Sequence, residues 1–151
     1  MHPIFLFLHL AGVVVWVGGM FFAWTCLRPV AAAQLEPPAR LRLWAAVFAR
    51  FFPWVWAAVL TIFLSGLLTM LATGMKYAPL HWHLMLLVGL TMSAIFIYVV
   101  VVPYGKLKMA VAAQDWPAGG TALGQIRRLI GINLVLGLAT IAVASLGRLM
   151  G

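Results

Sequence analysis

Four long apolar stretches, each close to the length needed to cross a lipid bilayer, constrain this chain more than any other feature. They cover residues 4–27, 51–73, 80–102 and 126–146. A transmembrane helix needs about 20 apolar residues, and in lipid only helices or closed barrels satisfy every backbone hydrogen bond. Because four segments cannot close a barrel, the sequence predicts an all-α integral membrane four-helix bundle, formed as a single domain over residues 1–151.

The composition excludes most soluble classes of protein. Hydrophobic residues make up 66% of the chain and charged residues only 8%, whereas soluble domains carry about 25% charged residues. The net charge of +8 would indicate nucleic acid in a soluble protein, but here the basic residues lie in or beside short connections, where they orient a membrane protein and meet anionic headgroups. We therefore expect the bilayer as a partner and no nucleic-acid binding.

The distribution of basic residues predicts the topology. Eight of them flank the first and third connections, against two at the second connection and the C-terminus. By the positive-inside rule, both termini and the second connection face outward (N-out/C-out), which is the periplasmic side in a bacterial inner membrane. The eight residues are Arg28, Arg40, Arg42, Arg50, Lys106, Lys108, Arg127 and Arg128, and the other two are Lys76 and Arg148.

All four histidines fall on this predicted outer side of the membrane. His2 precedes the first apolar run, His9 lies inside it, and His81 and His83 open the third run. An ionisable residue inside a span is costly and is by default a functional-site hypothesis. His9 is therefore the strongest single candidate for a functional residue.

The helix face that carries His9 also carries small residues. A rotation of about 100° per residue places Gly12, Trp16 and Gly19 on the same face as His9. The two glycines permit close approach of another backbone or of a flat ligand. This pattern predicts a groove beside His9.

The two histidines of the third run point in different directions. Being two residues apart on a helix, His81 and His83 differ by about 200°, so only one faces the bundle. His83 shares a stripe with Leu87, and we pair it with His9 as the two axial ligands of a haem b iron, with the porphyrin between helices. His81, at the membrane edge, is the alternative metal ligand.

Other residues leave two further interpretations open. The thioethers of Met70, Met75 and Met85 fall, like the histidines, in the predicted outer half of the membrane, and thioether with imidazole is a ligand set for copper. Each histidine could instead form only an interhelical hydrogen bond. The uncharged polar residues in or near the spans are expected to act in that way: Ser65, Thr69, Thr91, Ser93 and Asn133.

Parts of the first and third runs resemble a known family. The segment His9-Leu-Ala-Gly-Val-Val-Val-Trp16-Val-Gly-Gly19 is similar to the opening helix of the copper-resistance D (CopD) family and of the related HemJ-type protoporphyrinogen oxidases. The Leu27-Arg28-Pro29 stop and the Leu80-His-Trp-His83-Leu-Met opening resemble small CopD-like members. The resemblance implies a four-helix module. HemJ-type proteins bind haem b through the first-helix histidine and a lysine, whose place is taken here by His83, and larger CopD proteins are linked to copper uptake.

From these features we expect a small bis-histidine haem b cytochrome that exchanges electrons with quinol or another membrane redox partner. If it is an enzyme, it is an oxidoreductase. The alternative is a copper-binding or copper-import module that uses His2, His9, His83 and the outer methionines. Transport by so short a chain would call for a homo-oligomer. A non-catalytic membrane subunit is the third hypothesis.

Overall fold

A computed structural model describes residues 3–147 and shows them as a helical chain. Within that range, four helical segments are long and apolar enough to cross a membrane. The first comprises α1 (Pro3–Val13), α2 (Gly19–Phe22) and α3 (Arg28–Gln34), joined by π-helical turns at Val14–Gly18 and Ala23–Leu27. After it come α4 (Pro37–Thr73), a short 3₁₀ turn (Met75–Tyr77), α5 (Leu80–Val101), α6 (Pro103–Ala112) and α7 (Trp116–Leu146).

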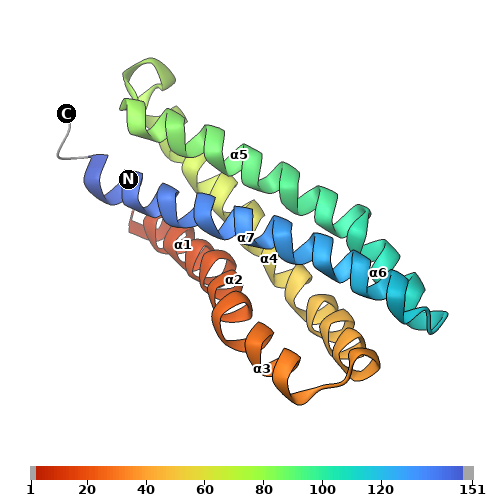
Figure 1. The fold of residues 1–151 in the computed structure, drawn as a ribbon. Helices are drawn as coiled ribbons and strands as arrows, with labels where there is room; N and C mark the ends of the chain where they lie inside the picture. Colours follow the sequence, from red (N-terminus) through yellow and green to blue (C-terminus); the bar gives the residue numbers. More distant parts are fainter. Residues whose placement is uncertain (1–2, 148–151) are drawn as a thin grey trace.

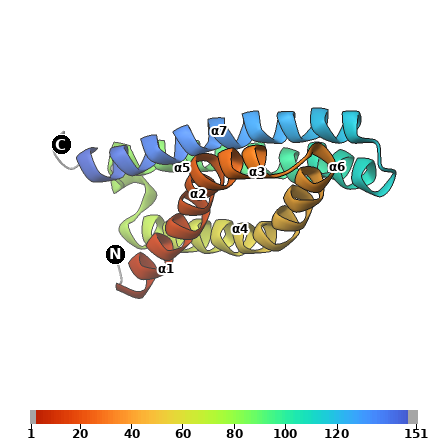
Figure 2. The same ribbon diagram turned by 60° about the horizontal axis from the view of Figure 1, so that its bottom comes forward.

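The helices form the predicted bundle, but the first segment crosses it obliquely. Helices α4, α5 with α6, and α7 run alongside one another (Figure 1). α1 packs against α4, whereas α2 and the second π-helical turn contact α7, so the segment moves from one helix to the other along its length (Figure 2). α1 begins, and α7 ends, at the end of the bundle that holds the α4–α5 loop (Figure 1).

The helices extend well beyond the apolar runs. The polar stretch between the third and fourth runs is mostly helical, in α6 and the first turns of α7. Pro103 and Pro117 occupy first-turn positions, where a missing N–H costs nothing. The Asp115 carboxylate caps α7 by accepting a hydrogen bond from the Ala118 N–H at 3.1 Å, as a good N-cap residue does. The two prolines and the Asp115 cap therefore favour helix in a stretch that the sequence predicts as a linker.

Aromatic packing fixes α4 against α5 and α6. Phe48 and Phe52 stack with ring centroids 5.1 Å apart, and the Tyr104 ring meets Phe52 edge-on at 4.9 Å. Phe96 of α5 adds a second edge contact to Phe52 at 5.5 Å. In lipid, close packing of this kind supports helix association more than the hydrophobic effect does.

Polar residues within the spans act in two ways. Asn133 of α7 donates a hydrogen bond from Nδ2 to the Met92 carbonyl of α5 at 3.0 Å, which confirms the expected interhelical role. Three others donate instead to carbonyls four residues earlier in their own helices: Thr69, Thr91 and Ser93.

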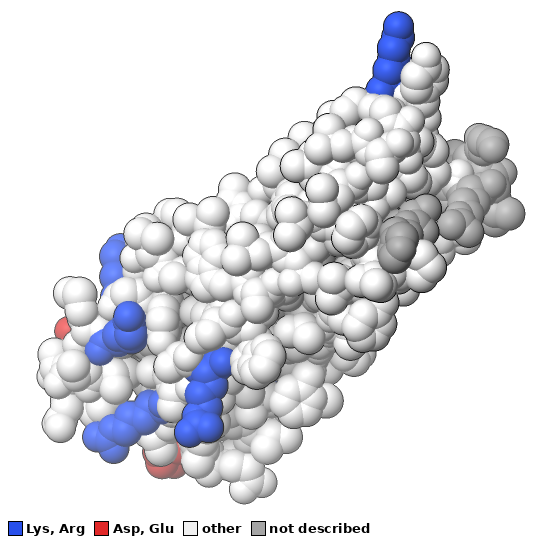
Figure 3. Space-filling view, turned by 180° about the vertical axis from the view of Figure 1, so that it is seen from behind, with Lys and Arg blue, Asp and Glu red and all other residues white. Residues whose placement is uncertain are grey.

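Positive charge is concentrated at one end of the molecule. Figure 3 shows the lysines and arginines gathered at that end, with an isolated one at the opposite end. Lys76 lies in the 3₁₀ turn between α4 and α5, and Arg148 lies outside the described residues. The orientation in a membrane of this bundle, with its charge at one end, stays a prediction.

Candidate functional site

His9 lies on α1 and faces α4, near the end of the bundle opposite the basic residues. Its Nδ1 atom is 3.1 Å from the Oγ of Ser65, a side chain only 2% exposed. Gly66 leaves room for the imidazole, since a Cβ at that position would lie 3.5 Å from His9 Cε1. Helix α4 thus supplies a hydrogen-bond partner for the His9 ring at Ser65 and space for the ring at Gly66.

The hydrogen bonds of Ser65 match one tautomer of neutral His9. The Ser65 hydroxyl donates to its own helix, where its Oγ is 2.6 Å from the Thr61 carbonyl oxygen and 3.1 Å from that of Ile62. With its single proton used there, Ser65 Oγ accepts from His9. In the tautomer that has its proton on Nδ1, His9 donates to Ser65 and carries its lone pair on Nε2.

The expected groove beside His9 is filled by side chains of α4. A Cβ on Gly12 would lie 2.8 Å from Ile62 Cγ1 and 3.1 Å from the Ala58 carbonyl oxygen. A Cβ on Gly19 would overlap the Phe51 ring. The glycines do permit close approach, as predicted, but the partner is helix α4 and not a flat ligand.

Trp16, the remaining member of the His9 face, belongs to the core. It is buried and meets the Phe96 ring edge-on, with centroids 6.2 Å apart. Its π-helical turn contacts both α4 and α7. Trp16 therefore lies where the first span meets the other three.

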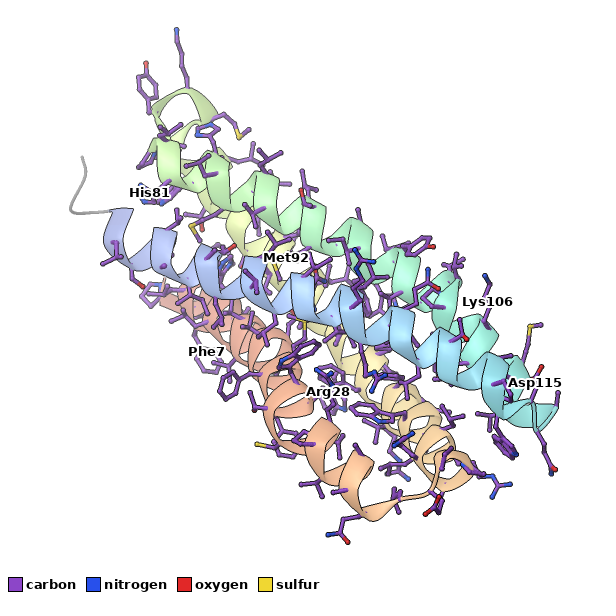
Figure 4. All side chains as sticks on the ribbon, in the orientation of Figure 1. Phe7, Arg28, His81, Met92, Lys106 and Asp115 are labelled. Atoms are coloured by element: carbon purple, nitrogen blue, oxygen red, sulfur yellow. The ribbon has the colours of Figure 1, made fainter. Side chains whose placement is uncertain are left out.

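His81 and His83 face different ways, as their spacing predicts. The sequence predicts that His83 faces the bundle, but in the structure His81 is the more buried of the two. His83 is exposed, with Nδ1 3.3 Å from the Pro79 carbonyl oxygen of its own helix start, and Leu87 on its stripe is 62% exposed. His81 is half-buried beside α7 (Figure 4), where a Cβ on Gly147 would lie 3.0 Å from His81 Cβ. Helix α5 is apolar on every side, so its sequence does not indicate which face packs.

The packing offers no place for haem b between His9 and His83. α1 packs mainly against α4, while α5 packs mainly against α7. Two cavities between the helices measure about 20 and 10 Å³, enough for about one water molecule each, and neither is lined by His9 or His83. Cofactor pockets are usually about 300 Å³ or larger. The residues present do not fit a porphyrin.

Any metal site would have to be small and use few ligands. In the part of the chain that the structure describes, no three side chains of His, Cys, Asp or Glu gather into a metal-binding group. Met70 is buried on α4, the helix that His9 faces, five residues after Ser65. His2, also proposed from the sequence, lies outside the described residues.

Sequence reasoning missed the specific role of Ser65 and the state of Asn133. Both were expected to form interhelical hydrogen bonds, but pairing of Ser65 with His9 depends on how α1 meets α4, which no spacing within one helix reveals. Asn133 is 3% exposed, and its Oδ1 atom has no hydrogen-bond partner among residues 3–147. Asn133 lines the cavity of about 20 Å³ together with Trp16 and Met20.

Comparison with known families gives one match. The family model described as Copper resistance protein D matches residues 45–146, which is more than half of the chain and covers most of α4 and all of α5, α6 and α7. The first span, including His9, lies outside the matched range. No curated protein and no solved structure matches the chain significantly.

Proposed function

The chain belongs to the copper resistance protein D family, and from that premise we propose that it is a copper-binding membrane module with His9 as its principal ligand. The observation that carries the proposal is the hydrogen bond between His9 and Ser65. It directs the ring and leaves Nε2 as the metal-binding nitrogen, as partners of ligating histidines do in metal proteins.

A thioether ligand from α4, the helix that His9 faces, would favour copper in its reduced form. Imidazole suits several transition metals, but thioether ligands select Cu(I). Met70 on α4 is the buried thioether closest in sequence to Ser65. The spans of residues 3–147 hold no carboxylate that would favour a hard cation, since Glu36 and Asp115 lie at the starts of α4 and α7.

The proposed site opens to the outer side of the membrane. The basic residues gather at the other end of the bundle (Figure 3), and the positive-inside rule assigns that end to the cytoplasm. In a bacterial inner membrane, His9 would then meet copper from the periplasm. The site would act in copper acquisition or buffering at that face.

Removing His9 is expected to weaken Cu(I) binding by about tenfold or more, because the imidazole is a direct ligand and the thioethers alone bind weakly. The measurement is a competition titration of the purified full chain with a chromophoric Cu(I) chelator, combined with metal content by elemental analysis. His9→Ala is compared with the wild type. The matched control is His83→Ala, which removes an exposed imidazole.

Equal Cu(I) affinity in the wild type and His9→Ala would contradict the proposal. A dithionite-reduced spectrum with a sharp alpha band would favour the haem b cytochrome instead, and with it the oxidoreductase chemistry, the quinol partner and the kinship to HemJ-type oxidases. Those remain predictions that the packing around His9 does not support. Copper uptake by cells carrying the gene tests import separately from binding.

Ser65→Ala is expected to lower Cu(I) affinity by about 10- to 100-fold, the usual effect of losing the partner of a ligating histidine. The imidazole remains, but its Nδ1–H loses the acceptor that fixes the tautomer and ring direction. Ser93→Ala is the matched control, because among the described residues the Ser93 hydroxyl bonds only to the Gly89 carbonyl of its own helix. Unchanged affinity in Ser65→Ala would show that Ser65 does not position the ligand.

A further inference from the structure

The larger of the two cavities lies inside the bundle, between the first span, α4, α5 and α7. Its volume is about 20 Å³, and most of its walls are aliphatic or aromatic side chains. Among the residues of the described chain that line it, only Trp16 and Asn133 carry a nitrogen or oxygen atom in the side chain. Both residues are 3% exposed, so their polar groups depend on partners within the bundle.

Asn133 supplies a hydrogen-bond acceptor that the described residues leave unpaired. Its Nδ2 donates to the Met92 carbonyl oxygen of α5 at 3.0 Å, about midway along the bundle (Figure 4). Because a carbonyl oxygen can only accept, the amide turns its nitrogen toward Met92 and its Oδ1 away from it. Within residues 3–147 no donor reaches this buried Oδ1. A buried acceptor normally has a partner, which is either a protein group or an ordered water molecule.

Trp16 supplies the complementary group, a hydrogen-bond donor. The indole N–H can only donate, and no acceptor for it lies among the described residues. The ring is held in place by its edge-on contact with Phe96, with centroids 6.2 Å apart. A buried tryptophan N–H usually finds a partner. An unpaired donor on the first span and an unpaired acceptor on α7 therefore line the same cavity.

The size and chemistry of the cavity match a single water molecule. A cavity needs about 10–15 Å³ to hold one water, which also needs at least two polar partners. The volume of about 20 Å³ meets the first requirement and is too small for a larger solute. Trp16 and Asn133 meet the second, and no charged side chain lines the cavity to compensate an ion.

We propose that one water molecule is bound in this cavity, where it accepts a hydrogen bond from the Trp16 indole N–H and donates one to Asn133 Oδ1. Water suits this pair because it accepts and donates at the same time. The bridge joins the first span to α7, and the Nδ2 bond of Asn133 extends it to Met92 of α5. Interhelical hydrogen bonds of this kind support helix association in lipid. The bound water is independent of the copper site proposed at His9.

Nuclear magnetic resonance of the full chain in detergent micelles tests the proposal. The probe is the indole Hε1 proton of Trp16 in deuterated, ¹⁵N-labelled protein, assigned by the loss of its signal in Trp16→Phe. The wild type is expected to show a rotating-frame Overhauser cross peak between this proton and water, with the sign of through-space transfer. Asn133→Leu removes the acceptor and fills the cavity, and it is expected to lose the cross peak.

The matched control is Thr140→Val, which removes a polar group of α7 that bonds to the Leu136 carbonyl of its own helix at 2.8 Å. This variant is expected to keep the cross peak. Absence of the cross peak in the wild type would overturn the proposal, and so would its persistence in Asn133→Leu or its loss in Thr140→Val. A cross peak with the sign of chemical exchange would also overturn it, because bulk water would then reach the indole.

A second pair of variants decides the question if Asn133→Leu fails to fold by circular dichroism. Val55→Ile adds a methylene group to a wall of the cavity and leaves both polar groups in place. Val59→Ile makes the same change one turn further along α4, at a buried residue that does not line the cavity. Loss of the cross peak in Val55→Ile alone would support the bound water, and equal behaviour of the two variants would contradict it.

Discussion

Gly12→Leu is expected to lower the free energy of unfolding by about 3 kcal/mol or more, at the upper end of the cost of overpacking. Gly12 is buried where α1 meets α4. A Cβ there would approach Ile62 Cγ1 to 2.8 Å and the Ala58 carbonyl oxygen to 3.1 Å. The side chain of Ile62 can rotate, but the Ala58 oxygen belongs to the helix backbone, so α1 itself must move away. Titration with a denaturing detergent, followed by circular dichroism, measures the change.

Gly18→Leu provides the matched control on the same span. A Cβ on Gly18 would meet nothing within 4 Å, and leucine favours a helix over glycine by about 0.8 kcal/mol. This variant is expected to be as stable as the wild type or slightly more stable. Comparable destabilisation by both substitutions would mean that α1 does not pack on α4 through Gly12. Because His9 lies on the same face, Gly12→Leu should also weaken Cu(I) binding, while Gly18→Leu should not.

The architecture could be predicted from the sequence because lipid leaves few choices. Apolar runs of spanning length must be helical, and the breaks at Thr73–Gly74 and Pro103 separate them. The oblique first span could not be predicted, since it depends on which helix each part of that span packs against. The prediction of a linker around Asp115 was also wrong. The Asp115 cap and Pro117 start a helix there although the composition of the segment is polar.

The candidate site divides in the same way. His9 was identifiable because an ionisable residue in an apolar run has a cost that needs a reason. The direction of the His83 side chain could not be predicted, because α5 is apolar all round and its sequence does not indicate which face packs. The pairing of His9 with Ser65 joins residues far apart in the chain, so only the packed structure reveals it.

Asn133→Asp is expected to destabilise the bundle by about 3 kcal/mol, the cost of placing an aspartate at the centre of a membrane helix. The Asn133 side chain is enclosed between α5 and α7, and its Oδ1 has no partner among the described residues. An added charge there would face Trp16 and Met20 across a cavity of about 20 Å³. The Nδ2 bond to the Met92 carbonyl would also be lost.

Asn133→Leu separates the effect of charge from that of the lost hydrogen bond. Leucine gives up the bond to Met92, worth about 0.6 kcal/mol between membrane helices, but it also removes the unpartnered oxygen and fills the cavity. Its stability should lie within about 1 kcal/mol of the wild type, since replacing poorly satisfied polar groups by apolar ones is nearly neutral. Gln125→Glu is the matched control for the charge, because Gln125 is exposed on α7 near the basic end. Within residues 3–147 its side chain makes one hydrogen bond, from Nε2 to the Tyr98 hydroxyl at 3.2 Å. If Asn133→Asp proves as stable as Gln125→Glu, bulk water reaches the cavity, and the middle of the bundle is open to a polar solute.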